Sequence, residues 1–383
     1  MALARDLYAE EHEQFRDIVR EFVERHAKPN AARWEAEGKV DRELFTAAAE
    51  AGILGFAVPE QYGGGGADDF RFNAVMGEEL ASNPVSNGMA GIALSNDITI
   101  PYFTDLADED QKARWLPGIA SGELITAIAM TEPGTGSDLS GIRTSAVRDG
   151  DDYVVNGSKI FISNGQNADL IATAVRTSPD PHKGLSLLVI ERGMAGFSRG
   201  KNLDKVGLHS QDTSELVFED VRVPAANLLG PEGAGFPGLM KNLPQERLSI
   251  AAAAVASSEG VLARTIAYVT ERTAFGKPIG SFQNTRFELA EMTTAVAASR
   301  AYIDRAIAQH CAGELSATDA AAAKFWTTEQ YVQIVNRCLQ LHGGYGYMKE
   351  YRIAQDYLDA RITTIYGGTT EIMKEIVGRG LGL

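Results

Sequence analysis

Apolar residues in the first part of the chain recur at intervals of three and four. The spacing of Phe15, Val19 and Phe22 predicts an amphipathic helix over residues 8–27. The same reasoning predicts three further helices, over 42–51, 69–80 and 108–116, the last ending before Pro117. We therefore expect residues 1–123 to form an N-terminal α-helical domain.

From residue 124 the pattern changes to short segments rich in β-branched residues and separated by Gly, Asn and Asp, which is typical of strands. These segments lie at 124–130, 144–148, 152–155, 160–162, 170–175, 186–190 and 215–219. The dipeptides Asp149-Gly150 and Asn156-Gly157 favour tight hairpin turns. We therefore predict a middle antiparallel β domain over residues 124–233.

After Pro224 the spacing becomes helical again. Helices are predicted over 236–273, 283–310, 318–341, 351–360 and 369–377. They are long and their connections are short, which favours antiparallel packing. We expect a C-terminal α-helical bundle domain over residues 234–383, in which Pro244 opens or kinks the first helix. The fold class is therefore α+β.

Charge and composition exclude several classes of function. The chain has 383 residues and a formal net charge of −15, which argues against a nucleic-acid partner because such a protein needs clustered Lys and Arg. No signal peptide is recognisable and no apolar run reaches the roughly 20 residues of a membrane span. We expect a cytoplasmic protein with no integral membrane segment. Cys311 and Cys338 lack metal-ligand spacing, so we predict buried apolar roles for both and no metal site.

Two motifs near the start of the long C-terminal helix have possible chemical roles. The glycines of Gly233–Gly238 resemble a dinucleotide fingerprint, but no βαβ unit surrounds them, so we interpret them as a helix entry. Glu246, which follows Pro244, is a candidate general base because a helix would hold its carboxylate rigidly. The alternative is that Glu246 complements the positive end of the helix dipole.

Five loops combine glycines with polar or aromatic side chains and are candidates for ligand binding. They are Met130–Asp138, Phe161–Ser163, Arg272–Gly276, Gln340–Gly346 and Tyr366–Glu371. Three of them have a simpler interpretation: the first is also a Pro-Gly turn, and the third and fourth are also ordinary helix ends. In the last loop Thr369 is a plausible N-cap for the closing helix.

In this order, the five loops and the Leu-Pro-Gln-Glu-Arg-Leu stretch around Glu246 resemble an acyl-CoA dehydrogenase. The resemblance covers essentially the whole chain and is strongest to the long-chain branch, which shares that stretch, Phe161 and Ile-Tyr-Gly-Gly-Thr near the C-terminus. Most of the family carries its catalytic Glu directly after the Tyr of the final loop, where this chain has Gly367. The long-chain and isovaleryl branches place the base at the position of Glu246.

The resemblance implies FAD as cofactor and an acyl-CoA as substrate. The residues implied to contact FAD or close its site are Met130, Thr131, Gly136, Ser137, Phe161, Ser163, Arg272, Phe275, Gln283, Gln340, Gly344, Thr369 and Glu371. Those implied to contact the substrate are Ser137, Arg247, Gly367 and Gly368. Some of the contacts to FAD, those of Arg272 and Gln340 among them, would be made across a subunit boundary, which implies a homotetramer built as a dimer of dimers.

The implied reaction is α,β-dehydrogenation of a saturated acyl-CoA to a trans-2-enoyl-CoA in fatty-acid β-oxidation or related catabolism. Glu246 would remove the α-proton and a β-hydride would pass to the flavin. An electron-transferring flavoprotein would then accept the electrons. The alternatives are an acyl-CoA oxidase, which uses oxygen directly, and a non-catalytic acyl-CoA-binding subunit. The sequence leaves the length and branching of the acyl chain open.

Overall fold

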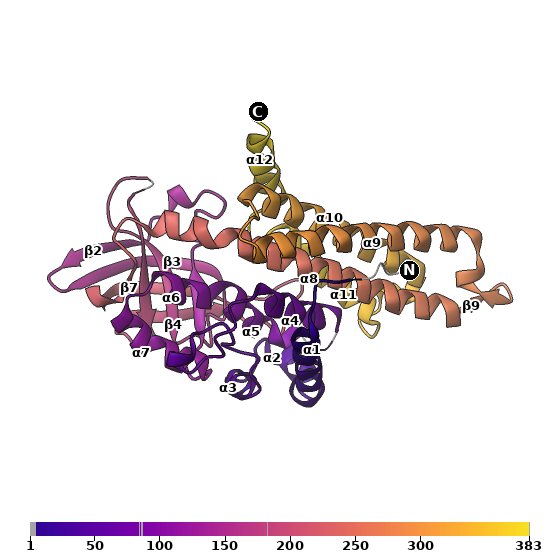
Figure 1. Ribbon diagram of the computed structural model, residues 1–383, viewed down its shortest axis with the longest axis horizontal. Helices are drawn as coiled ribbons and strands as arrows, with labels where there is room; N and C mark the ends of the chain where they lie inside the picture. The colour runs from indigo at the N-terminus through magenta and orange to yellow at the C-terminus, as the bar shows by residue number, and fades with distance from the viewer. Residues whose placement is uncertain (1–4, 84, 86, 182, 383) are drawn as a thin grey trace.

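The computed structural model describes residues 5–83, 85, 87–181 and 183–382. Figure 1 shows a sheet at one end of the molecule, N-terminal helices along one side, and long C-terminal helices that reach the opposite end. One hydrophobic core is shared by the N-terminal helices and the sheet, because residues such as Trp34, Phe103 and Leu187 belong to the same buried cluster.

The N-terminal part is helical, as predicted. Its α-helices are α1 (Glu10–Phe22), α2 (Ala31–Glu37), α3 (Glu43–Glu50), α4 (Phe70–Ser82), α5 (Ala90–Leu94), α6 (Ile100–Leu106) and α7 (Glu109–Ala120), and two π-helical segments are η1 (Val23–Ala27) and η4 (Ser95–Thr99). The prediction that Pro117 ends a helix was wrong, because α7 continues through it to Ala120. Proline removes only one donor, and Ile119 and Ala120 are buried in the core. The sequence pattern did not predict α2, α5 and α6.

The middle part is one sheet with the strand order β6-β7-β3-β2-β4-β5-β8, and β1 pairs with β4. The strands are β1 (Thr126–Ala129), β2 (Ser145–Asp149), β3 (Asp152–Ser163), β4 (Leu170–Arg176), β5 (Leu185–Glu191), β6 (Phe197–Asn202), β7 (Thr213–Pro224) and β8 (Leu228–Leu229). The predicted antiparallel sheet is only partly correct, because β4 pairs in parallel with both β1 and β2. Residue patterns mark strands but do not specify their partners.

The two predicted hairpin turns had different outcomes. Asp149 pairs with Asp152 across a tight β2–β3 turn, as expected. Asn156-Gly157 is no turn, because β3 runs through it with a shift in register against β7. A Cβ on Gly157 would lie 2.6 Å from the Thr144 hydroxyl oxygen, so close packing explains this glycine.

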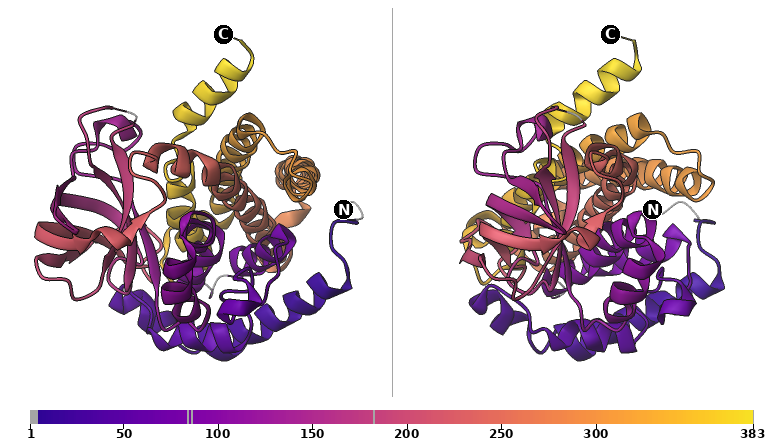
Figure 2. Two further views of the ribbon diagram at one scale, coloured as in Figure 1. Left: turned by 60° about the vertical axis from the view of Figure 1, so that its left-hand side comes forward. Right: turned by 90° about the vertical axis from the view of Figure 1, so that its left-hand side faces the viewer.

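The C-terminal part is a bundle of long helices, as predicted (Figure 2). Its helices are α8 (Gly235–Glu271), α9 (Gln283–Cys311), α10 (Ala317–His342), α11 (Arg352–Ala360) and α12 (Thr370–Gly380), with the short 3-10 segments η8 (Gly343–Tyr347) and η9 (Arg361–Thr364). A small hairpin of β9 (Thr273–Ala274) and β10 (Lys277–Pro278) joins α8 to α9. The glycines at 233–238 mark the entry to α8, and Pro244 lies inside that helix.

The expected burial of both cysteines needs correction. Cys338 is buried, but Cys311 is exposed, and its thiol donates to Asp69. Within the described residues one helix, α8, is long and apolar enough to cross a membrane, although sequence analysis expected none. Half of its most apolar stretch is buried inside the protein. We attribute the apolar character of α8 to its central position in the bundle.

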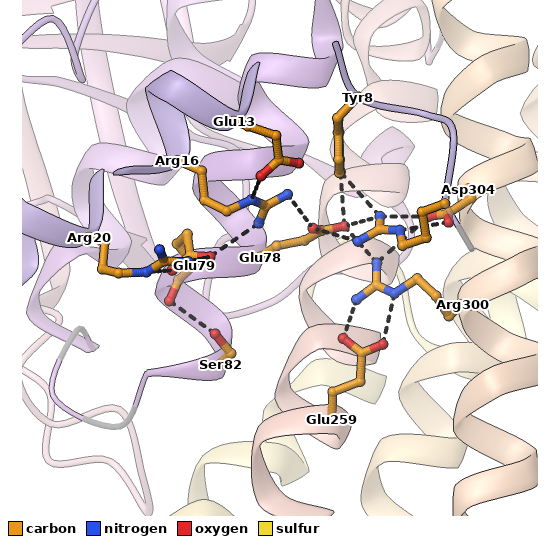
Figure 3. A network of polar contacts seen from close by, with 11 residues as sticks. Tyr8, Glu13, Arg16, Arg20, Glu78, Glu79, Ser82, Glu259, Arg300 and Asp304 are labelled. Carbon is orange, nitrogen blue, oxygen red and sulfur yellow. Dashed lines mark hydrogen bonds and ion pairs between the residues drawn. The ribbon is translucent and has the colours of Figure 1, made fainter. Parts of the chain in front are cut away.

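A network of ion pairs joins the N-terminal helices to the bundle (Figure 3). At its centre Glu78 of α4 accepts from Arg5 (2.7 Å) and from Arg300 of α9 (2.6 Å). Arg300 also pairs with Glu259 of α8 at 2.6 Å. Burial alone would raise the pKa of Glu78, but the guanidinium groups of Arg5, Arg300 and Arg16 lower it below its ordinary value. The network fixes α4 against α8, the helix that carries Glu246.

Candidate active site

The carboxylate of Glu246 is enclosed between two helices. Its side chain, on α8, is 3% exposed, and the hydroxyl of Tyr102 on α6 donates to its Oε1 at 2.8 Å. Burial raises the pKa of Glu246 to about 7, although the Tyr102 hydrogen bond and the charge of Arg247 both oppose the increase. A carboxylate with such a pKa is well suited to accept a proton near neutral pH.

The glycine at the alternative base position lies beside the same helix. Gly367 has a left-handed backbone (φ +64°), and a Cβ there would lie 2.4 Å from Cδ1 of Ile250. Ile250 follows Glu246 by one helical turn, so both side chains project from one face of α8. The structure therefore brings Glu246 and the final loop to one side of α8, and Ile250 fills the space that a side chain at position 367 would need.

Two buried cationic side chains lie close to the final loop. Lys324, buried on α10, donates to the backbone oxygen of Gly368 at 2.7 Å. Burial and the nearby charge of Arg247 lower the pKa of Lys324 to about 8, while the charge of Glu371 opposes this. Arg247 is 7% exposed, and its Nε has no hydrogen-bond partner among the described residues. A buried donor of this kind can bind an oxygen of a ligand.

The loop that follows β1 is fixed to β3 by buried hydrogen bonds. Lys159 Nζ donates to the backbone oxygen of Met130 and to Glu132 Oε1, both at 2.9 Å. The N–H of Ile160 donates to the backbone oxygen of Thr131 at 2.9 Å. These bonds place Met130 and Thr131 beside the end of β3. Further along the same loop Gly136 and Ser137 are exposed.

Next to this loop an aromatic ring faces solvent. Phe161 adopts a left-handed backbone (φ 62°) and its side chain is 63% exposed. A non-glycine residue in this conformation costs of order 1–3 kcal/mol and is often found at functional sites. Ser163 follows at the end of β3. An exposed ring beside a fixed polar loop is a suitable surface for a planar ligand.

A second group of candidate residues lies around the β9–β10 hairpin. Arg272, Gln340 and Gly344 line a cavity of about 520 Å³, and the Arg272 guanidinium lies 5.3 Å from the centre of the Tyr345 ring. Phe275, in the hairpin, is 95% exposed. Gln283 begins α9 and is also exposed. Figure 1 shows the hairpin at the end of the bundle that is farthest from the sheet. The structure therefore does not bring this group to the Phe161 surface within one chain.

The remaining candidates lie in the final loop and in α12. The Thr369 hydroxyl accepts from the N–H of Ile372 and caps α12, as predicted. Glu371 lies in the first turn of that helix and is exposed. Gly368 has φ +97°, and a Cβ there would lie 2.5 Å from the Met373 methyl carbon. The loop from Gly367 to Thr369 is thus packed closely against its neighbours.

Comparison with known proteins decides the family. Residues 9–123, 127–221 and 233–382 match the family models "Acyl-CoA dehydrogenase, N-terminal domain", "middle domain" and "C-terminal domain". The chain belongs to the acyl-CoA dehydrogenase family. The resemblance drawn from the sequence motifs is confirmed, and so are the fold of helical, β and helical domains and the enzyme class.

Relatives of this acyl-CoA dehydrogenase match over nearly its whole length. The mitochondrial long-chain specific acyl-CoA dehydrogenase of Sus scrofa is 44% identical over 98% of this chain and 87% of its own. An acyl-CoA dehydrogenase structure from Geobacillus kaustophilus is 49% identical, with a TM-score of 0.97, over 99% of this chain and 100% of its own. A glutaryl-CoA dehydrogenase of Mycobacterium smegmatis, solved with FADH2, is 27% identical, with a TM-score of 0.89, over 98% of this chain and 95% of its own.

Two side chains of this acyl-CoA dehydrogenase site were not predicted from the sequence. Tyr102 belongs to α6, a helix that the sequence pattern did not reveal. Lys324 is a single charge that follows four alanines in α10, and a lysine within an apolar helix stretch is a signal for a buried contact. Because each lies far along the chain from Glu246 or Gly368, their pairing requires the fold.

Proposed function

We propose that this protein is an FAD-dependent dehydrogenase that converts a saturated acyl-CoA to the trans-2-enoyl-CoA, with Glu246 as the base. The observation that supports this most directly is the buried Glu246 carboxylate, whose pKa is raised to about 7. Glu246 lies on the same face of α8 as Ile250, the residue that the Gly367 loop packs against. A saturated acyl-CoA has a weakly acidic α-proton, so its removal needs a positioned base of this kind.

The residues around Phe161 fit a flavin. The exposed ring of Phe161, the fixed oxygens of Met130 and Thr131, and the exposed Gly136 and Ser137 offer an apolar face with polar groups at its edge. They would hold the isoalloxazine and ribityl parts together with Ser163. When bound, FAD would accept the hydride that leaves the substrate β-carbon.

The protein's own groups have distinct roles in this proposal. Glu246 takes the α-proton, and its burial keeps water away from the carboxylate. The backbone N–H of Gly367 would donate to the thioester oxygen as negative charge develops there; a single donor of this type typically contributes about 2.7–4 kcal/mol. Arg247, with its unpaired buried Nε, would position the acyl-CoA near the final loop.

We expect an acyl-CoA to bleach the yellow flavin of the purified protein under anaerobic conditions. A series of straight-chain and branched acyl-CoAs of increasing length, followed by absorbance, tests this. The 44% identity to a long-chain specific enzyme supports starting with long straight chains. Electron-transferring flavoprotein should then reoxidise the flavin. Rapid reoxidation by oxygen with peroxide release would favour an acyl-CoA oxidase, and a flavin that no acyl-CoA bleaches would favour a non-catalytic binding subunit.

The separation of the two FAD-contact groups supports a homotetramer in which one subunit completes the cofactor site of another. Arg272, Phe275, Gln283, Gln340 and Gly344 would reach the pyrophosphate and adenine of a neighbour's FAD. Light scattering of the flavin-loaded protein should give four times the chain mass of 41.1 kDa. A monomer that retains a full complement of FAD would refute this assembly. The cytoplasmic location stays a prediction.

A further inference from the structure

A tyrosine on a separate helix contacts the Glu246 carboxylate. Tyr102 has no exposed surface, and its hydroxyl donates to Oε1 of Glu246 at 2.8 Å. Its neighbour Phe103 is also fully buried and packs edge-on against Trp115 of α7, with ring centres 5.7 Å apart. Tyr102 therefore projects from a helix that the core holds rigidly.

The two oxygens of the Glu246 carboxylate have different surroundings. Oε1 accepts from Tyr102, and none of the described residues donates to Oε2. We propose that Tyr102 is a positioning residue for the base: it holds Oε1, favours the charged carboxylate, and leaves Oε2 free to take the substrate α-proton. The proposal rests on the function given above for Glu246. In that step the Cα–H bond breaks and the proton bonds to Oε2. The electron pair of that bond forms the Cα–Cβ double bond as the Cβ–H bond breaks, and the hydride that leaves Cβ would be accepted by the FAD of the proposed function.

The other charged groups around Glu246 affect its pKa or make hydrogen bonds elsewhere. Arg247 follows it on α8 and lowers its pKa, while Lys324 of α10 lies within electrostatic reach of Arg247. Asp97 of η4 is a second buried carboxyl against α8: its backbone oxygen accepts from Gln245 at 2.9 Å, and its side chain accepts from Asn73 at 2.7 Å. Burial raises the pKa of Asp97 to about 7. A test must therefore distinguish the two carboxyls.

Tyr102→Phe keeps the ring and removes only the hydroxyl. Because a hydrogen bond to a charged group stabilises the charged form, its loss should raise the pKa of Glu246 by about one to two units. Only the deprotonated carboxylate can accept a proton. The low-pH limb of the flavin-reduction rate should therefore move up by about one to two pH units, and the rate at pH 7 should fall about 5–50-fold. The loss should be smaller at high pH.

A second measurement is independent of turnover. Infrared difference titration records the carbonyl band of a protonated carboxyl, and the band missing in Glu246→Gln identifies Glu246 and separates it from Asp97. Its midpoint should rise in Tyr102→Phe. The matched control is Tyr153→Phe, which removes a similar hydrogen bond from a buried tyrosine to Glu232 (3.0 Å) in a different part of the fold. That control should leave the midpoint and the rate profile unchanged.

The outcomes separate this inference from the proposed function. A Glu246 band whose midpoint is the same in Tyr102→Phe and in the parental protein would overturn the role of Tyr102, even if acyl-CoA bleaches the flavin normally. A shifted midpoint in a protein whose flavin no acyl-CoA bleaches would instead overturn the proposed dehydrogenation and leave the Tyr102 contact in place.

Discussion

Glu246→Gln is expected to slow reduction of the bound flavin by acyl-CoA about 10²–10⁴-fold, which is the usual contribution of a positioned general base. Glutamine keeps the shape of the side chain, and its amide oxygen can still accept from Tyr102 (2.8 Å from Glu246 Oε1 in the structure). The amide cannot take a proton from the substrate at neutral pH. Anaerobic stopped-flow absorbance measures the rate, and equilibrium titration should show nearly unchanged binding of FAD and acyl-CoA.

A second glutamate provides the control for this change. Glu232 also accepts a hydrogen bond from a tyrosine, Tyr153, but it lies before the start of α8 and is exposed. Glu232→Gln should reduce flavin at the parental rate. If Glu246→Gln also keeps the parental rate, the base is another residue and the proposed mechanism is wrong.

The sequence predicted the order and type of most long elements because their patterns are local. Apolar spacing of three and four located α8, α9 and α10 with errors of a few residues. Strand pairing is not local, and the parallel pairs of β4 with β1 and β2 were therefore missed. Asn156-Gly157 shows the same limit: its composition is that of a turn, but its tertiary packing against Thr144 keeps it within β3.

The candidate base was predicted from its place on a helix and from the family resemblance. The structure excludes the simpler interpretation, in which Glu246 complements the helix dipole. α8 begins at Gly235, about three turns before Glu246. Glu246 is therefore too far from the helix N-terminus to be stabilised by the positive end of the helix dipole. Its burial and its hydrogen bond to Tyr102 come from packing between α6 and α8. Neither property is visible in the sequence, because the two residues are 144 positions apart. The pKa that makes Glu246 a suitable base therefore arises only on folding.

The same packing predicts how a carboxylate at position 367 would behave. In the Glu246→Gln background, Gly367→Glu alone should restore less activity than it does together with a smaller residue at position 250, because the terminal methyl of Ile250 lies 2.4 Å from the position of a Cβ there and must first move. The left-handed backbone at Gly367 adds about 1–2 kcal/mol of strain for a non-glycine residue. Adding Ile250→Ala removes the δ-methyl group that occupies the space. The triple variant should therefore reduce flavin about 10–100-fold faster than Glu246→Gln, a partial recovery of a general base.

Two variants show whether the new carboxylate causes that recovery. Glu246→Gln with Ile250→Ala enlarges the site without adding a base and should remain as slow as Glu246→Gln. Replacing Gly367 with Gln in the triple variant adds similar bulk and the same backbone strain, but no group that accepts a proton, and it should also remain slow. If either control recovers as much as the Glu variant, a change in shape explains the rate. If the Glu variant shows no recovery although it folds and binds FAD, the two positions do not reach the same α-proton, and the proposed relocation of the base from position 367 to Glu246 fails.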